Sequence, residues 1–147
     1  MLNNSGSKNV IISVSGTQAI IDQGINHVEL VTEGRYYKKA DTYYAVYKES
    51  EVTGMEGTTT TLKISDRSVT LMRFGTVNTQ FIFEQGQKHM SYYDTVNGAF
   101  TIGIFTNEVD VSVDDDGGQI KVDYEIEIDG QKSGINDFIM VIRQAGG

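Results

Sequence analysis

Apolar side chains occupy every second position over most of this chain, and Gly, Asn and Asp separate the alternating segments at hairpin spacing. A period of two places successive side chains on opposite faces of a β-strand. The pattern therefore predicts an all-β chain of short antiparallel strands with no long helix. The predicted strands span residues 9–20, 26–37, 42–51, 58–65, 68–74, 79–85, 88–95, 99–106, 109–114, 119–129 and 134–143.

The lengths of the turns decide which residues oppose one another, because a slip of one residue moves every side chain to the other face. We expect turns at residues 66–67, 86–87, 96–98, 107–108 and 115–118, since these keep large apolar side chains on one face. The predicted opposed pairs are Ile64 with Val69, Leu62 with Leu71, Phe83 with Met90, Phe81 with Tyr92, Tyr92 with Ile102, Met90 with Ile104, Ile104 with Val111, Ile102 with Val113, Val113 with Ile120, and Val111 with Val122. Residues 62–128 then form one meander with a single apolar face.

An open sheet of about ten strands would leave two exposed edges and one wet apolar face. Closure into a barrel removes both. Consecutive short hairpins favour up-and-down order, so we predict a closed antiparallel barrel of about 8–10 strands, with a sandwich as the alternative. We expect one domain over residues 9–145, preceded by a flexible tail at residues 1–8.

Composition and charge narrow the function classes. The chain has no Cys, Pro or Trp, which excludes disulfides, thiolate metal sites and cysteine nucleophiles. The net charge is −8, from 12 basic and 20 acidic residues. Residues 107–137 hold ten of the acids and two of the bases, leaving ten of each elsewhere. We therefore expect neither nucleic acid nor an anionic membrane as a partner. No signal peptide or apolar span is visible, which predicts a cytoplasmic protein.

Several motifs resemble those of a known family. They are Gly34-Arg35-Tyr36-Tyr37, the tyrosine strand through Tyr47 and Glu49, Met72-Arg73-Phe74-Gly75, and Met90-Ser91-Tyr92-Tyr93 before Asn97-Gly98. In order and spacing they resemble the YwiB-like proteins, small bacterial proteins of unknown function, over about residues 10–143. The resemblance implies a calycin-like (lipocalin-like) barrel, and the wider calycin group implies a carrier of small hydrophobic molecules. Lipocalins carry a Gly-x-Trp near the first strand that this chain lacks, and fold does not dictate function.

Arg73 is the most informative candidate residue. It shares the predicted apolar face with Leu71 and Val69, so its guanidinium points into or across one end of the barrel and needs acceptors. The functional interpretation is an anchor for the carboxylate of a bound ligand. The structural alternative is that Arg73 closes the barrel end against backbone carbonyls or an acid such as Glu49.

Aromatic side chains supply the other candidates for a ligand site in the barrel interior. Tyrosine offers an apolar ring with a hydroxyl at its tip, which suits an amphipathic ligand. The alternative is that these rings only fill the interior, since a small barrel has little room for both. The predicted interior residues are Tyr36, Tyr43, Tyr47, Tyr92, Tyr124, Phe81 and Phe83.

No motif predicts catalysis, a metal site or a cofactor. Ser112, Asp114, Asp116, Gly117 and Asp123 have partial EF-hand spacing, but the flanks alternate as strands, so we reject that interpretation. His89 is predicted to pair with Glu84 on the outer face, and Asp110 to oppose Asp123. We therefore expect a binding module for a small hydrophobic or amphipathic ligand. The alternative is an interaction module whose acidic outer face binds a basic protein, and an enzyme is the third hypothesis.

Overall fold

The structure, a computed structural model, describes residues 7–20, 24–53, 55–76, 78–95 and 98–145 and confirms the all-β prediction. The strands are β1 (Lys8–Ile20), β2 (Gly24–Lys39), β3 (Thr42–Lys48), β4 (Thr58–Ile64), β5 (Ser68–Gly75), β6 (Thr79–Glu84), β7 (Lys88–Thr95), β8 (Gly98–Asp114), β9 (Gly117–Ile128) and β10 (Gln131–Gln144). A 3-10 turn, η2 (Glu51–Thr53), follows β3. The predicted tail, residues 1–8, lies mostly outside the described residues.

All ten strands belong to one antiparallel sheet in the order β6-β5-β4-β3-β2-β1-β10-β9-β8-β7. Each strand pairs with its neighbours in the chain except at β6 and β7, which form the two edges. The first strand, β1, pairs with the last strand, β10, with Val10 opposite Gln144. The sheet therefore curves round until only the gap between β6 and β7 is left. The barrel is therefore nearly closed, and the prediction that a hairpin pairs Phe83 with Met90 and Phe81 with Tyr92 is wrong.

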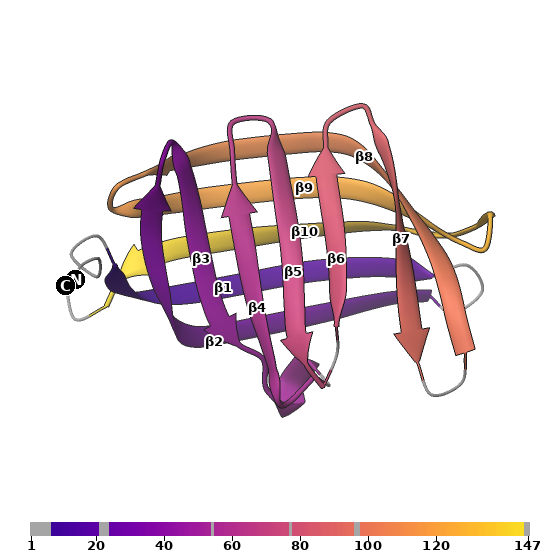
Figure 1. The fold of residues 1–147 in the computed structure, drawn as a ribbon, viewed down its shortest axis with the longest axis horizontal. Helices are drawn as coiled ribbons and strands as arrows, with labels where there is room; N and C mark the ends of the chain where they lie inside the picture. The colour runs from indigo at the N-terminus through magenta and orange to yellow at the C-terminus, as the bar shows by residue number, and fades with distance from the viewer. Residues whose placement is uncertain (1–6, 21–23, 54, 77, 96–97, 146–147) are drawn as a thin grey trace.

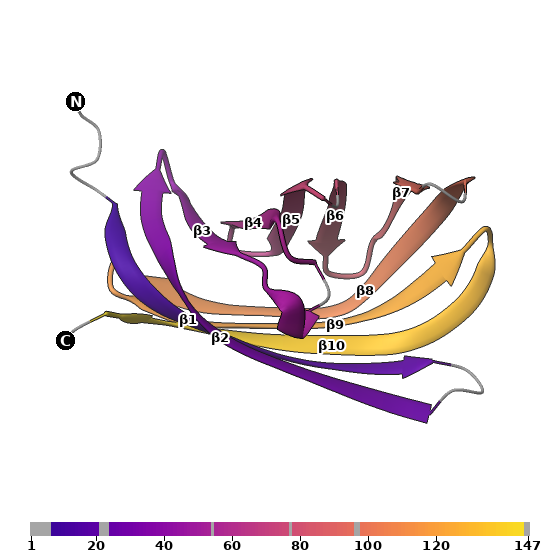
Figure 2. The ribbon, with the colours of Figure 1, turned by 90° about the horizontal axis from the view of Figure 1, so that it is seen from below.

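The strands form two layers that enclose the core. The long strands β1, β2, β8, β9 and β10 make one curved layer, and the shorter β3 to β6 run across it (Figure 1). Seen from below, the short strands lie over the concave side of the long ones (Figure 2). β2 belongs to both layers, because it pairs with β1 along most of its length and with β3 near its end.

The hairpin of β4 and β5 has the predicted register, with Leu62 opposite Leu71 and Ile64 opposite Val69. Both strands are paired on both sides, and buried residues alternate along β4 and the first half of β5, so these side chains fix the register. All four residues are at least nine-tenths buried.

The predicted turn at residues 107–108 is wrong. β8 continues through it as one strand of 17 residues, with a bulge between Thr106 and Glu108. The 12-residue β9 is long enough to pair with both halves of β8, so the chain has no need to reverse. A bulge accommodates one extra residue and bends the strand, which suits a curved layer.

The turn between β8 and β9 is shorter than predicted and shifts the register by two residues. Val111 opposes Ile120, and Asp110 opposes Lys121 where Asp123 was predicted. Gly117 and Gly118 have φ values of 120° and 146°, and a Cβ on Gly118 would lie 2.1 Å from a backbone oxygen. Only glycine fits such a close approach, so the turn tightens to residues 115–116.

β7 faces the opposite way from the prediction. Tyr92 opposes Thr101 and is 78% exposed, whereas Ser91 opposes the inward-facing Ile102. Gly103 lacks a side chain and leaves room on the outer face for Met90. β7 is also an edge strand, so its apolar pattern does not decide its register. Val96 and Asn97 of the predicted three-residue loop lie outside the described residues, and Thr95 opposes Gly98.

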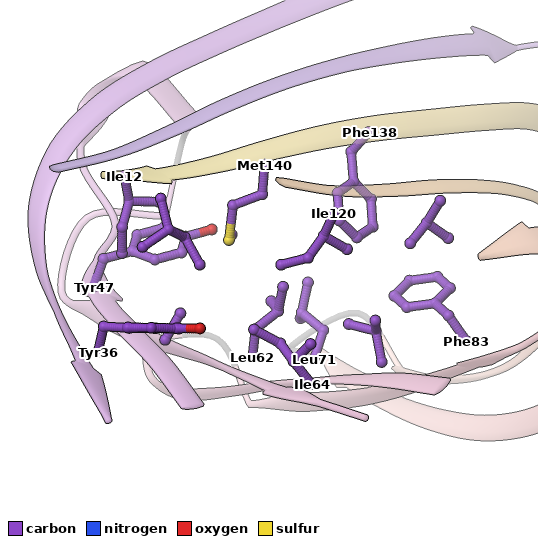
Figure 3. Packing of buried hydrophobic residues seen from close by; sticks show 14 of the residues in the cluster. Ile12, Tyr36, Tyr47, Leu62, Ile64, Leu71, Phe83, Ile120, Phe138 and Met140 are labelled. Carbon is purple, nitrogen blue, oxygen red and sulfur yellow. The ribbon is translucent and has the colours of Figure 1, made fainter. Parts of the chain in front are cut away.

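The core lies between the two layers. Ile12, Ile120, Phe138 and Met140 point from the long strands toward side chains of the short strands (Figure 3). The short-strand side chains in this cluster include Tyr47, Leu62, Ile64, Leu71 and Phe83. Several of these side chains line a cavity inside the barrel.

Candidate functional site

A cavity of about 240 Å³ lies inside the barrel. Strands of both layers and the loop around η2 contribute to its wall, which is mainly apolar with a few polar groups. The lining residues are Val14, Gly16, Val28, Leu30, Tyr47, Glu49, Thr53, Met55, Leu62, Leu71, Arg73, Phe81, Phe83, Tyr124, Ile126, Asp137, Phe138 and Met140. An apolar cavity with a few polar groups has the chemistry of a small-molecule site, although ligand pockets usually exceed about 300 Å³.

A row of polar side chains marks one end of the short-strand layer. Tyr47, Thr60, Arg73 and Thr79 lie directly opposite one another on β3, β4, β5 and β6. All four share the inward face, because each lies two residues along its strand from an inward-facing apolar residue. Strand register therefore assembles a polar row at the edge of an apolar cavity.

Glu49 closes this row from the end of β3. Its side chain is 1% exposed, and its backbone N–H donates to the carbonyl of Thr58 at 2.8 Å. The Thr53 hydroxyl donates to Oε1 at 2.9 Å, and the Thr60 hydroxyl donates to Oε2. The Arg73 Nε lies 3.8 Å from Oε2, forming an ion pair. Both carboxylate oxygens of Glu49 are thus held by the protein, as a buried charge requires.

Arg73 is less fully satisfied than its partner. Its side chain is 19% exposed, and its buried Nε has no hydrogen-bond partner. The Oγ1 of Thr79, directly opposite on β6, is also buried without a partner. Buried polar groups normally find partners, so the Arg73 Nε and the Thr79 hydroxyl are two donors left without a hydrogen-bond acceptor at this end of the barrel.

The tyrosines of the cavity are neutral hydrogen-bonding groups. Burial raises the pKa of Tyr47, and the negative charge of Glu49 raises it further. Burial also raises the pKa of Tyr124. Tyr124 packs against Phe83 and Phe138, with ring centroids 4.7 and 6.4 Å away. Neither phenol ionises near neutral pH, so both serve as apolar surface with a hydroxyl.

Of the predicted site residues, the structure brings five to the cavity: Arg73, Tyr47, Tyr124, Phe81 and Phe83. Tyr92 is on the outer surface, so its prediction as an interior residue is wrong. Tyr36 is buried but does not line the cavity. Its hydroxyl donates to the Asp114 carbonyl at 2.7 Å, which ties β2 to the β8–β9 turn.

Tyr43, another predicted interior residue, stacks on Tyr36 with ring centroids 5.2 Å apart. Its hydroxyl donates to the Asp115 carboxylate at 2.5 Å. Both tyrosines therefore belong to the β8–β9 end of the core.

The prediction from sequence missed several wall residues. Thr53 and Met55 come from the η2 loop, and Val28 and Leu30 come from the part of β2 that pairs with β1. Alternation marks Val28 and Leu30 as one face of a strand, but their nearness to Arg73 depends on how the layers cross. Glu49 carries a usable signal, since a lone Arg on an apolar face needs an acid and the sequence offers Glu49 as that partner.

The outer face of the long strands carries the acidic residues. Glu108, Asp123 and Asp137 lie directly opposite one another on β8, β9 and β10. His89 and Glu84 pair as predicted, with Nε2 and Oε1 2.9 Å apart, but the predicted outer-face hairpin is wrong, because β6 and β7 share no ladder and His89 lies opposite the inward-facing Ile104. The described side chains contain no group of three or more His, Asp or Glu that could hold a metal ion. A basic protein partner for this face stays a prediction.

The fold and the cavity together define the class of this protein. It is a small, nearly closed antiparallel β-barrel whose apolar interior has polar side chains at one end. Within this class the chain belongs to the family described as "Domain of unknown function (DUF1934)", whose model matches residues 12–140. A similar solved structure is that of the YwiB protein from Bacillus subtilis, with a TM-score of 0.82 and 21% identity over 95% of this chain and 93% of that chain. The resemblance to the YwiB-like proteins is thereby confirmed, and the fold is consistent with a calycin-like barrel.

No curated protein matches the chain. In the part of the chain that the structure describes, no helix is long and apolar enough to cross a lipid bilayer.

Proposed function

We propose that this protein is a non-catalytic binding protein whose barrel interior holds one small amphipathic molecule. The ligand has an apolar body and a head group that accepts hydrogen bonds, such as a carboxylate or an amide carbonyl. The observation that carries the proposal is the Arg73 guanidinium, which borders the cavity with its buried Nε unpartnered. A buried arginine without full hydrogen bonding is costly unless a ligand completes it.

The chemistry of the row favours an acceptor over a cationic head group. Glu49 already accepts from two threonine hydroxyls, so it has little capacity left for an ammonium group. Arg73 lines the cavity with its Nε lacking an acceptor, and Thr79, opposite it on β6, has an unpartnered hydroxyl. The guanidinium fork also suits a planar carboxylate or amide.

Cavity volume limits the size of the ligand. A cavity of roughly 150 Å³ holds benzene, so one of about 240 Å³ accommodates roughly ten non-hydrogen atoms. The aromatic wall of Phe81, Phe83 and Tyr124 fits a single aromatic ring or a short branched chain.

The test compares four probes of one size: benzoate, benzamide, toluene and benzylamine. We expect calorimetry to give tighter binding for benzoate and benzamide than for toluene or benzylamine, with amide NMR shifts located on β5 and β6. Tightest binding of benzylamine, or no binding of any probe, would contradict the proposal. An Arg73→Lys variant keeps the charge but loses the planar fork. It should weaken benzoate binding about tenfold and leave toluene binding unchanged.

A further inference from the structure

The gap in the barrel separates two strands that follow each other in the chain. No ladder joins β6 and β7 within the described residues, and the strands move apart from the loop that connects them (Figure 1). Near the loop, the His89 Nε2 on β7 lies 2.9 Å from the Glu84 Oε1 on β6. Further along, the Ser91 hydroxyl donates to the Gln80 carbonyl at 2.7 Å. The seam between β6 and β7 is thus bridged at separate points only.

A hollow of about 250 Å³ lies on this seam. Its wall includes Ile82, Met90 and Tyr92, which face outward, and also Phe81 and Ile104, which face inward. Ile104 is only 1% exposed. Side chains from both faces of a sheet can line one hollow only where the wall is open between two strands. The seam hollow therefore extends from the surface to the core layer.

Phe81 lines both the seam hollow and the interior cavity. Phe81 lies on β6 opposite Leu71. It is two residues from Thr79 of the polar row and on the same face of the strand. Its neighbour Phe83 lines the interior cavity but not the seam hollow. Phe81 is therefore the residue that lines both spaces.

We propose that Phe81 is the specificity-determining residue of this protein and limits the length of the ligand to what the interior cavity holds. This inference rests on the proposed function. A ligand anchored at Arg73 extends past Leu71 toward Phe81, whose ring ends the apolar channel. The ligand class is thus a compact carboxylate or amide, and the seam hollow is an outer subsite that only a smaller residue at position 81 opens.

The experiment measures the affinities of benzoate, 3-phenylpropanoate and 5-phenylpentanoate by calorimetry. For the native protein we expect affinity to fall as the chain lengthens. In Phe81→Leu and Phe81→Ala the order should reverse, with a gain of about fourfold for each methylene that is newly buried in the seam hollow. Ile82→Val, the matched control at the next position of β6, lines the seam hollow but not the interior cavity and should keep the native preference for benzoate. Phe81→Leu keeps the experiment informative if Phe81→Ala does not fold.

The outcomes separate the two proposals. Binding of benzoate with the same length dependence in native protein and both Phe81 variants would overturn the role of Phe81 and leave the proposed function standing. An equal shift in Ile82→Val would also overturn it, because a general loosening of the seam between β6 and β7 would then explain the gain. Failure of every probe with every variant would overturn both proposals.

Discussion

Glu49 holds the polar end of the cavity together at the scale of single residues. Two threonine hydroxyls and the Arg73 guanidinium converge on its carboxylate, which is almost wholly buried. Removing one partner of a buried ion pair leaves the other without compensation, whereas an apolar pair of similar volume is often tolerated.

We therefore predict that Glu49→Ala lowers the free energy of unfolding by about 2–4 kcal/mol, slightly below the usual loss because Arg73 keeps some solvent contact. The double variant Glu49→Ala, Arg73→Met should recover a large part of this loss. Urea denaturation of the native protein and both variants measures the difference. An equal loss in single and double variants would show that the ion pair does not couple the two residues.

The tyrosines give the protein a stability that depends on alkaline pH. The hydrogen bond to Asp115 raises the pKa of Tyr43 to about 12. Burial raises the pKa of Tyr36, Tyr47 and Tyr124. In the unfolded chain a tyrosine ionises near about pH 10. Because the folded values are higher, the contribution of these groups is complete below pH ~10 and is lost as the pH rises through Tyr43's folded value.

We predict that the free energy of unfolding falls steeply above pH ~10, and that part of the tyrosinate absorbance appears only as the chain unfolds. A pH titration followed by near-ultraviolet absorbance and circular dichroism measures both. Ionisation of all eight tyrosines near pH ~10 with native dichroism intact would contradict it. Tyr43→Phe removes one of the raised groups and should make the fall less steep.

At the scale of the strands, the acidic row of Glu108, Asp123 and Asp137 opposes like charges across two ladders. Directly opposed like charges destabilise a sheet. Two residues along the same strands and on the same face, Asp110 lies opposite Lys121, where the charges attract. Asp123, which faces like charges, and Asp110, which faces an opposite charge, can therefore be compared on the same surface.

We predict that Asp123→Asn raises the free energy of unfolding by about 0.2–1 kcal/mol at low salt, and that Asp110→Asn lowers it by a similar amount. Both effects should shrink in about 1 M salt, where the screening length is only about 3 Å. Thermal or urea denaturation at two salt concentrations measures them. A loss of stability in Asp123→Asn would indicate that its carboxylate has a favourable partner.

Strand position explains how much of the structure the sequence predicts. The β4–β5 hairpin was predicted to the residue because burial on one face leaves a single register for Leu62 and Leu71. The same rule failed for β7, since an edge strand can leave Tyr92 in water at little cost. It also failed at residues 107–108, where a bulge satisfies the same alternation as a turn.

The cavity was predictable only in part for a similar reason. Arg73 and its partner Glu49 follow from chemistry, because an arginine on an apolar face needs an acceptor. Met55 and Thr53 carry no such signal, since their place in the wall depends on the η2 loop folding over the end of the barrel. Alternation predicts which face of a strand a residue occupies. It does not predict which residues of the long-strand layer lie over which residues of the short-strand layer.

At the scale of the whole molecule, the net charge of −8 is spread unevenly, with the acids concentrated on the long-strand layer. The ion pair between Lys132 and Glu125 on this layer, with Nζ and Oε1 3.3 Å apart, has an exposed lysine. Exposed pairs of this kind contribute little to stability. The barrel is held mainly by its buried side chains and ladders, and the seam is the one place among the described strands where successive strands lack a ladder.

The position of the seam also bears on how the chain reaches this fold. Read from β7 around to β6, the sheet order is an uninterrupted meander in which β10 is followed by β1. The pairing of β1 with β10 joins the two ends of the described chain and must be formed at the greatest sequence separation. The Ala145 N–H donates to the Asn9 carbonyl at 3.2 Å, so these ends already touch.

A circular permutant that starts at Lys88 and links Gln144 to Lys8 turns every ladder into a local hairpin. Because loop closure over long separations slows folding, it should refold faster than the native order while keeping a similar stability. Stopped-flow refolding compares the two chains, and equal rates would show that the β1–β10 ladder forms after the rate-limiting step. The gap in the barrel wall is thus also the natural breakpoint of the polypeptide.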